Sequence, residues 1–291
     1  MDTYTFGPLT VRRVGFGAMQ LPGRGVFGPP RDRDQALAVL RRAVELGVNH
    51  IDTAQYYGPD VSNELIREAL HPYPDDLVLV SKVGGRRDDT GAWLPAQTPR
   101  ELRSGVEDNL RSLKVEQLGA VNLRLMAEHE LPPGEQPPAL EDQLAEMVAL
   151  REEGKIAGVG ISTASLEQVD QAIDTAGIVC VQNPFSLLDQ HDSAVLDRCQ
   201  EAGLAYVPYF PLGSAFPGMP KVPENGVVQR VAERLGVTPA QVGLAWLLAH
   251  RENILLIPGT SSLAHLEQNV AVAGVVLSDD DIVELETGAV G

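Results

Sequence analysis

The sequence predicts an α/β fold, a single (β/α)8 TIM barrel with an N-terminal β-hairpin and a short C-terminal helix. Two observations predict it. Short apolar runs alternate with helical segments along almost the whole chain, and such strands suit a parallel sheet covered on both faces. Eight strand and helix pairs of this kind close into a barrel, whose strand ends meet at one mouth. We expect residues 1–291 to form one domain, since barrels of roughly 250 residues fold as one unit.

The elements follow from hydrophobic periodicity and from turn and capping residues. Tyr4 to Val11 alternates around Gly7-Pro8, which predicts the hairpin. The predicted barrel strands are Val14–Met19, Val48–Asp52, Leu77–Lys82, Ala120–Met126, Ala157–Ile161, Ile178–Gln182, Ala205–Pro208 and Ile254–Ile257. The predicted helices are Asp34–Leu46, Val61–Leu70, Pro99–Leu113, Leu140–Arg151, Leu166–Ala176, His191–Ala202, Gly226–Leu235, Pro239–His250, Leu263–Ala271 and a terminal one near Asp279–Glu286.

An open, doubly wound sheet is the alternative fold. Such a sheet usually binds a dinucleotide through the pattern G-x-G-x-x-G directly after its first strand. Here Gly15 and Gly17 lie inside the predicted strand, and residue 20 is Gln. The sequence therefore favours the barrel.

Composition excludes several classes of partner. The chain has 23 basic and 40 acidic residues, a formal net charge of −17, and it is 44% hydrophobic. We therefore expect no nucleic acid and no membrane among its partners. Cys180 and Cys199 form no motif and fit a reducing compartment, so with no signal-like start we expect a cytoplasmic protein. No metal site is expected, and the sequence leaves the oligomeric state open.

Three chemically active residues fall at the ends of two neighbouring strands. Asp52 ends one strand, Tyr57 follows it, and Lys82 ends the next. A buried charge needs a partner, so Asp52 and Lys82 are predicted to pair. An ammonium near a phenol lowers the tyrosine pKa from about 10, so Tyr57 is predicted to donate a proton to a carbonyl oxygen. From these residues alone, an unconnected scatter of common side chains stays open.

The same stretch resembles the aldo-keto reductase family, and the resemblance covers nearly the whole chain. Asp52-Thr53-Ala54, Tyr57-Gly58 and Lys82 after an apolar strand are similar to that family's catalytic aspartate, tyrosine and lysine in spacing and flanking sequence. The resemblance implies NADPH-dependent reduction of a small-molecule aldehyde or ketone to an alcohol.

The resemblance also implies a cofactor site, with NADPH as the expected cofactor and NADH as the alternative. Ser162, Thr163 and Gln182 correspond to groups that hold the nicotinamide amide, with Thr163 in place of an Asn. Tyr209 corresponds to the tyrosine that stacks on the nicotinamide, and the backbone at Leu212 and Gly213 to that beside the pyrophosphate. The residues corresponding to the segment that binds the adenosine 2′-phosphate and the adenine are Gly259, Thr260, Ser261, Ser262, His265, Gln268 and Asn269.

Residue chemistry alone already suggests an anion site at Thr260 to Ser262. Hydroxyls between a strand and a helix lie beside the free amides of the helix start, where anions bind. Plain N-capping by these side chains is the alternative.

Two positions depart from the family pattern. The usual active-site histidine falls on Met126 or Ala127, and His129, Asn122 and Arg124 are the alternatives for its role. Gly259 and His265 stand where many relatives carry Lys and Arg, which predicts a milder preference for NADPH over NADH.

The expected substrate walls include Met19, Trp93, Arg124 and Met126, with Phe27, Phe216 and Met219 on nearby loops. The stretches at Val121–Arg124 and Gln182-Asn183 resemble bacterial reductases of the pyridoxal-reducing kind. The missing histidine keeps open an NADPH-binding regulatory or redox-sensing subunit with little turnover. A barrel lyase or isomerase without a nicotinamide is the third alternative.

Overall fold

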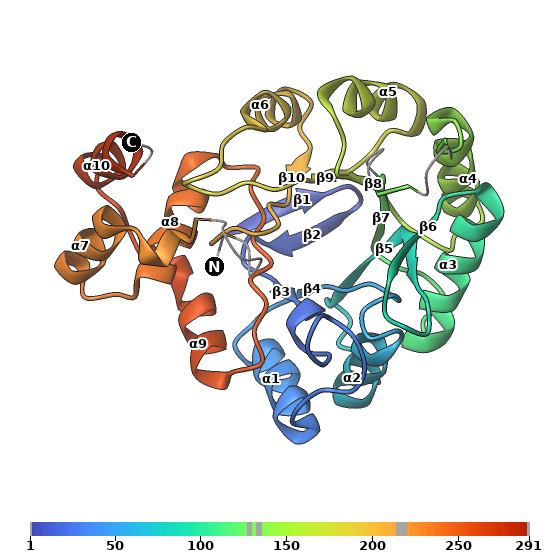
Figure 1. Ribbon diagram of the computed structural model, residues 1–291, viewed down its shortest axis with the longest axis horizontal. Helices are drawn as coiled ribbons and strands as arrows, with labels where there is room; N and C mark the ends of the chain where they lie inside the picture. Colours follow the sequence, from blue (N-terminus) through green and yellow to red (C-terminus); the bar gives the residue numbers. More distant parts are fainter. Residues whose placement is uncertain (1, 127–129, 132–135, 214–219, 290–291) are drawn as a thin grey trace.

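The computed structural model describes residues 2–126, 130–131, 136–213 and 220–289. Its main sheet confirms the predicted (β/α)8 fold, with parallel strands in the order β10-β9-β8-β7-β5-β4-β3. Figure 1 shows these strands as a ring with helices around the outside. The strands are β3 (Phe16–Gly17), β4 (His50–Asp52), β5 (Val78–Arg87), β7 (Ala120–Arg124), β8 (Val159–Ser162), β9 (Cys180–Gln182) and β10 (Ala205–Tyr206).

The ring closes through the segment that was predicted as the last strand, Ile254–Ile257. Isolated parallel bridges join Tyr206 to Ile254 on one side and Val14 to Leu256 on the other. The Leu255 amide donates to the Tyr206 carbonyl at 2.9 Å, and the Gly15 amide donates to the Leu256 carbonyl at 2.8 Å. The segment thus occupies the position of the eighth strand, although its pairing is too short for a regular ladder.

The helices cover the outside of the ring. Six predicted helices match the structure residue for residue. Capping boxes mark the starts of three of them, at Thr98 before Pro99, at Ser165, and at Thr238 before Pro239. The helices are α1 (Arg33–Glu45), α2 (Val61–Leu70), α3 (Pro99–Leu113), α4 (Leu140–Glu152), α5 (Leu166–Ala176), α6 (Ser193–Glu201), α7 (Gly226–Leu235), α8 (Pro239–His250), α9 (Leu263–Ala271) and α10 (Asp279–Gly288), with short 3₁₀ turns at Ala18–Gln20, Val222–Glu224 and Val272–Gly274.

One element was missed. The loop predicted after Lys82 is instead a continuation of β5, which pairs antiparallel with β6 (Trp93–Ala96). Asp88 organises the turn between them, since its Oδ1 accepts from the amides of Thr90 and Ala92, both at 2.9 Å. Gly84 and Gly85 gave the segment the appearance of a turn. The predicted first strand is also shorter, since it becomes a 3₁₀ turn at Ala18.

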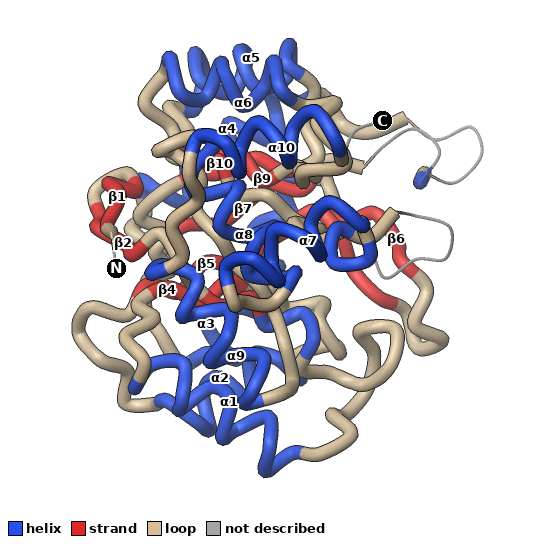
Figure 2. Tube along the Cα trace, turned by 90° about the vertical axis from the view of Figure 1, so that its left-hand side faces the viewer, coloured by secondary structure: helices blue, strands red, loops and turns tan. Residues whose placement is uncertain are grey.

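The two ends of the barrel differ. The hairpin β1 (Thr3–Phe6) and β2 (Leu9–Arg12) lies at one end and β6 at the opposite end, as Figure 2 shows. Phe6 and Val11 of the hairpin pack against Val80 and Leu255 inside the barrel, so the hairpin closes that end. A larger apolar core fills the layer between strands and helices. No helix among the described residues is long and apolar enough to cross a membrane.

Candidate active site

Asp52 and Lys82 form a buried ion pair inside the barrel, as the sequence predicted. Their side chains are only 5% and 7% exposed, and the Lys82 Nζ contacts Asp52 Oδ1. β4 and β5 are parallel neighbours, with Asp52 opposite Val80, so Lys82 lies two residues nearer the mouth. The Lys82 Nζ also donates to the Thr53 carbonyl at 2.9 Å. These two acceptors offset the desolvation of the ammonium.

Asp52 has a second partner that sequence reasoning missed. The Gln182 Nε2 donates to Asp52 Oδ2 at 3.0 Å from the end of β9. Both side chains are buried. The sequence placed Gln182 beside the cofactor only, and no local signal relates two residues 130 positions apart. The Asp52 carboxylate is therefore held from two sides of the barrel.

Tyr57 lies beside this pair, with the Lys82 ammonium over its ring. Its side chain is 6% exposed, and the Lys82 Nζ is 5.0 Å from the centroid of its ring. Burial raises the pKa of Tyr57 well above 10, the Asp52 charge raises it further, and Arg124 and Arg87 oppose the shift. The predicted lowering by Lys82 was wrong, because burial of the phenol dominates the shift and the Asp52 charge adds to it. The phenol consequently keeps its proton at neutral pH, as a proton donor must.

A chain of buried polar side chains supports the site from outside the barrel wall. The Thr53 hydroxyl donates to Asn63 Oδ1 at 2.9 Å, and Asn63 Nδ2 donates to Asn109 Oδ1 at 2.9 Å. The Ser81 hydroxyl donates to the same oxygen at 2.6 Å. This network fixes Thr53, whose carbonyl accepts from Lys82. It was not predicted.

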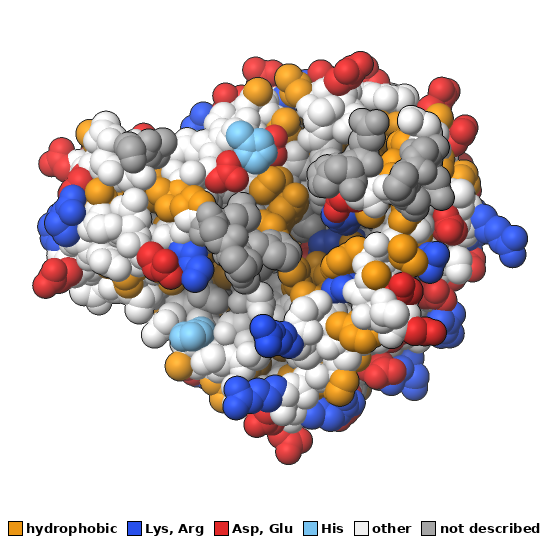
Figure 3. Space-filling view, viewed as in Figure 1, with side chains coloured by type: hydrophobic (Ala, Val, Ile, Leu, Met, Phe, Trp, Pro, Cys, Tyr) orange, Lys and Arg blue, Asp and Glu red, His pale blue; other side chains and the backbone are white. Residues whose placement is uncertain are grey.

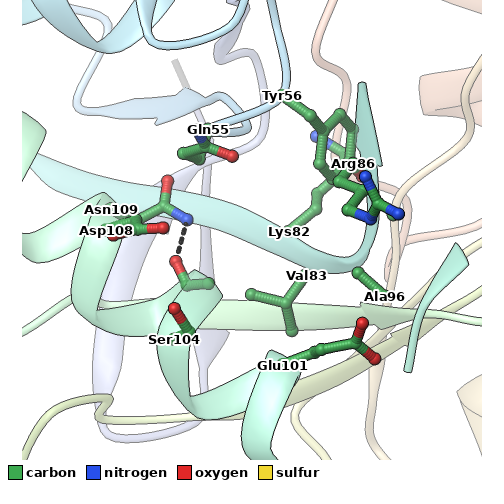
Figure 4. A pocket seen from close by; sticks show the side chains of 13 residues that line it. Gln55, Tyr56, Lys82, Val83, Arg86, Ala96, Glu101, Ser104, Asp108 and Asn109 are labelled. Atoms are coloured by element: carbon green, nitrogen blue, oxygen red, sulfur yellow. Dashed lines mark hydrogen bonds between the residues drawn. The ribbon is translucent and has the colours of Figure 1, made fainter. Parts of the chain in front are cut away.

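A pocket of about 140 Å³ lies beside this network, between β5 and α3. Figure 4 shows Asn109 on α3 and Lys82 on the neighbouring strand at its wall. The Asn109 Nδ2 donates to the Gly105 carbonyl at 2.8 Å. Glu101 and Asp108 give the pocket an acidic side. Tyr56 and Lys82 also line it, so it adjoins the active-site side chains from the side of α3.

The mouth is a hollow with positively charged side-chain atoms inside it and hydrophobic side chains along its rim (Figure 3). Four of the predicted cofactor residues lie close together at the strand ends. Thr163, with φ 60°, follows Ser162 at the end of β8, and its hydroxyl is 3.5 Å from that of Tyr209. The Thr163 amide donates to the Gln182 carbonyl at 3.1 Å. A ring stacked on Tyr209 would therefore have amide and hydroxyl groups at its edge.

Two glycines mark places where backbone segments approach closely. A Cβ on Gly213, which has φ 88°, would lie 2.3 Å from the Pro220 carbonyl oxygen. A Cβ on Gly259 would lie 2.5 Å from the Gly17 carbonyl oxygen. Leu212 is partly buried against the main core. Any side chain at residue 259, including the lysine that the family resemblance leads one to expect, would collide with the backbone of β3.

The start of α9 combines capping with free amides. The Ser262 hydroxyl accepts from the His265 amide at 3.4 Å, and Thr260 Oγ1 accepts from the Ser262 amide at 3.0 Å. Within the described residues, the amides of Leu263 and Ala264 have no acceptor. The capping alternative is therefore correct for Ser262, and it leaves amides that fit an anion.

The remaining predicted residues of this segment lie around that start. Ser261 and His265 are exposed, Gln268 is half-buried, and Asn269 is buried. The Gln35 side chain donates to the Ser261 carbonyl, and the Gln241 side chain donates to the Gln268 carbonyl. Both contacts use the backbone of Ser261 and Gln268 and not their side chains.

Arg124, and not Asn122, reaches the mouth from β7. Asn122 lines a small cavity deeper in the barrel, where its Oδ1 accepts from Cys180 Sγ at 3.3 Å. The Arg124 guanidinium pairs with Glu130 at 2.7 Å and contacts Met126 Sδ. His129, Phe216 and Met219 lie outside the described residues. The structure thus places an arginine beside the position expected for a histidine.

The other predicted substrate residues surround the tyrosines. Met19 is half-buried against the small cluster of Ala54, Tyr56 and Tyr57. Trp93 is 42% exposed, and the Arg87 guanidinium lies 3.7 Å from the centroid of its ring.

Comparison with known proteins agrees with this geometry. A model of the aldo/keto reductase family matches residues 13–288. The chain belongs to the aldo/keto reductase family. It is 47% identical to pyridoxine 4-dehydrogenase of Escherichia coli K12, over 98% of this chain and 97% of that protein. The predicted resemblance and the predicted oxidoreductase class are therefore confirmed.

Two solved structures of aldo/keto reductases from Klebsiella pneumoniae resemble this fold. One contains NADPH and is 27% identical, with a TM-score of 0.80, covering 100% of this chain and 96% of that one. The other contains NADP and acetate and is 26% identical, with a TM-score of 0.80, covering 99% and 95% of the two chains.

Proposed function

We propose that this aldo/keto reductase reduces an aldehyde or ketone to an alcohol, with NADPH as reductant and Tyr57 as proton donor. The observation that carries the proposal is the position of Tyr57. Its buried phenol lies beside the Asp52–Lys82 pair, and the centroid of its ring is 5.0 Å from the Lys82 Nζ.

The chain's own residues perform the proton transfer. NADPH, when bound, supplies a hydride from nicotinamide C4 to the carbonyl carbon. The Tyr57 hydroxyl donates its proton to the oxygen, and acid catalysis of this kind contributes about 10² to 10⁴-fold. Lys82, held by Asp52 and Thr53, lies near the phenolate that forms. Asp52 keeps the ammonium charged and in place, with Gln182 holding the second carboxylate oxygen.

Residues around the mouth fit the two ends of NADPH. Tyr209 and Thr163, with Ser162 and Gln182 beside them, offer a ring and polar groups for the nicotinamide amide. At the other end, the free amides of α9 and the hydroxyls of Thr260 and Ser261 suit a 2′-phosphate. The Klebsiella relatives that contain NADP and NADPH support this cofactor.

An aromatic aldehyde of the pyridoxal type is the substrate class we favour. Tyr56 and Trp93 pack edge to face with centroids 5.2 Å apart and form an aromatic wall beside Tyr57. Met19, Arg124 and Met126 complete the surroundings. The 47% identity to E. coli pyridoxine 4-dehydrogenase supports this class.

The decisive test replaces Tyr57 by Phe. Tyr57→Phe should abolish NADPH consumption with pyridoxal and 4-nitrobenzaldehyde, while quenching of NADPH fluorescence by the protein persists. Tyr4→Phe, in the hairpin at the closed end, is the matched control and should keep its turnover. Turnover in Tyr57→Phe would remove this residue from the role. Negligible turnover by the wild type across a panel of aldehydes, with tight NADPH binding, would favour a regulatory subunit instead.

A further inference from the structure

A small cavity lies inside the barrel next to Asp52, and Phe6 of the hairpin forms part of its wall. Its volume is about 10 Å³, which is room for about one water molecule. Cavities that stay dry are lined by apolar groups. This one is lined in large part by buried polar side chains, which are His50, Asp52, Asn122, Cys180 and Gln182.

Two of these side chains carry a polar atom without a partner. Within the described residues, His50 Nδ1 and Asn122 Nδ2 make no hydrogen bond. His50 is only 3% exposed and Asn122 is fully buried. Buried polar groups without a partner are unfavourable and rare, so two of them on the wall of one cavity indicate a ligand that they share.

The backbone leaves space for both side chains inside the barrel. A Cβ on Gly15 would lie 2.2 Å from Cε1 of the His50 ring, and a Cβ on Gly160 would lie 2.2 Å from Asn122 Oδ1. The ring and the amide thus occupy positions that any larger residue at 15 or 160 would block.

The two unpartnered atoms have complementary hydrogen-bonding roles. Burial lowers the pKa of His50 to about 4, so the ring is neutral at pH 7 and has one donor and one acceptor nitrogen. The Arg12 backbone accepts a hydrogen bond from the ring and Nδ1 has no partner, so we assign the proton to Nε2 and the lone pair to Nδ1. Asn122 Oδ1 accepts from Cys180 Sγ at 3.3 Å, which leaves Nδ2 as a donor. One water molecule can accept from Nδ2 and donate to Nδ1, and its second hydrogen is then available to Asp52.

We propose that this cavity binds one water molecule, which His50 and Asn122 position to donate a hydrogen bond to the Asp52 carboxylate. Lys82 contacts one oxygen of that carboxylate and Gln182 donates to the other, and each oxygen can accept a further hydrogen bond. The water is the third donor to Asp52. His50 and Asn122 are therefore positioning residues, which act on the reaction only through Asp52, and this kinetic consequence rests on the proposed function.

A high-resolution crystal structure of the wild-type protein tests the water directly. We expect one water molecule within hydrogen-bond distance of His50 Nδ1, Asn122 Nδ2 and an oxygen of Asp52. A dry cavity, or a water that does not reach Asp52, would overturn the proposal. This measurement needs no variant to fold and no turnover.

Variants at residue 50 test the positioning role. His50→Leu removes the acceptor for the water, so the single-turnover rate of NADPH oxidation with 4-nitrobenzaldehyde should fall by about 10-fold, while quenching of NADPH fluorescence persists. His50→Asn retains an acceptor oxygen near the position of Nδ1 and should restore most of the rate. Equal losses of rate in the two variants, or no loss in either, would mean that no water positions Asp52.

Asn122→Leu and Asn253→Leu form a matched pair. Both asparagines are buried with one unpartnered polar atom, but Asn253 lies away from the cavity and donates to the Leu204 carbonyl at 3.0 Å. Urea unfolding should show a loss of stability in both variants, whereas only Asn122→Leu should also lose single-turnover rate. An unchanged rate in Asn122→Leu would contradict the positioning role. A wild type that reduces no aldehyde would defeat the proposed function, and the crystal structure would then still decide whether the water is bound.

Discussion

Gln182 donates a hydrogen bond from Nε2 to Asp52 Oδ2 at 3.0 Å, across the inside of the barrel. Lys82 contacts the other oxygen of the same carboxylate. Lys82 is therefore positioned by an aspartate that is itself held from β9. Removal of the amide would leave one buried carboxylate oxygen without its donor.

Gln182→Met should weaken both folding and turnover. The change keeps the length of the side chain but removes the hydrogen bond to a buried charge, so the free energy of unfolding should fall by about 1–3 kcal/mol. At saturating NADPH, kcat should also fall, because Asp52 no longer fixes Lys82 as firmly. Denaturant unfolding and steady-state kinetics measure the two effects.

Gln143→Met is the matched control for that change. Gln143 is also buried, but it lies on α4 and donates to the neutral Pro138 carbonyl at 2.9 Å. It should lose less stability than Gln182→Met and keep its kcat. Equal losses of stability in the two variants, with kcat unchanged in both, would show that Gln182 has no positioning role.

The sequence predicted the parts of the site that depend on local signals. Asp52, Lys82 and Tyr57 follow apolar strands, and a parallel barrel brings strand ends together. Helix bounds such as those of α3 were predicted to the residue because Thr98 and Pro99 mark the start. β6 was missed because Gly84 and Gly85 resemble a turn.

Contacts between distant segments were not predictable in the same way. The bond from Asn63 to Asn109 joins residues 46 positions apart, and only the packing of α2 on α3 brings them together. The predicted direction of the Tyr57 pKa shift was also wrong, because the shift depends on burial and on which group pairs with Lys82. Hydrophobic periodicity and capping residues reveal neither the burial of a phenol nor the partner of an ammonium.

His265→Arg should tighten NADPH binding. The side chain is exposed in the first turn of α9, next to the predicted 2′-phosphate site, and an added charge-assisted contact should lower the Kd by roughly 10-fold. NADH binding should not change, because NADH lacks that phosphate. Fluorescence titration with the two cofactors measures both. Restoring a lysine at residue 259 instead is not an option, since the Cβ would collide with Gly17.

The chain has a net charge of −17, so any added positive charge could strengthen the long-range attraction of the anionic NADPH, and this effect needs its own control. His71→Arg adds the same charge after α2, away from the start of α9. If His71→Arg tightens NADPH binding as much as His265→Arg does, then the gain reflects overall charge and the 2′-phosphate does not lie at α9.

His50 gives stability a pH dependence from inside the barrel. Its side chain is buried on β4, two residues before Asp52, and burial lowers its pKa from 6.5 to about 4, against the opposing charge of Asp52. The unfolded chain binds a proton near pH 6.5 and the folded chain does not, so stability from this group is present above that pH and is lost as pH falls toward 4. From about pH 7.5 to about pH 5.5 the loss should be about 1.4 kcal/mol.

His50→Asn, which cannot titrate, should lack this loss, so the difference in unfolding free energy between wild type and variant should shrink by that amount. A difference that stays constant between the two pH values in urea unfolding would mean that His50 is protonated equally in both states, and that its burial does not shift its pKa.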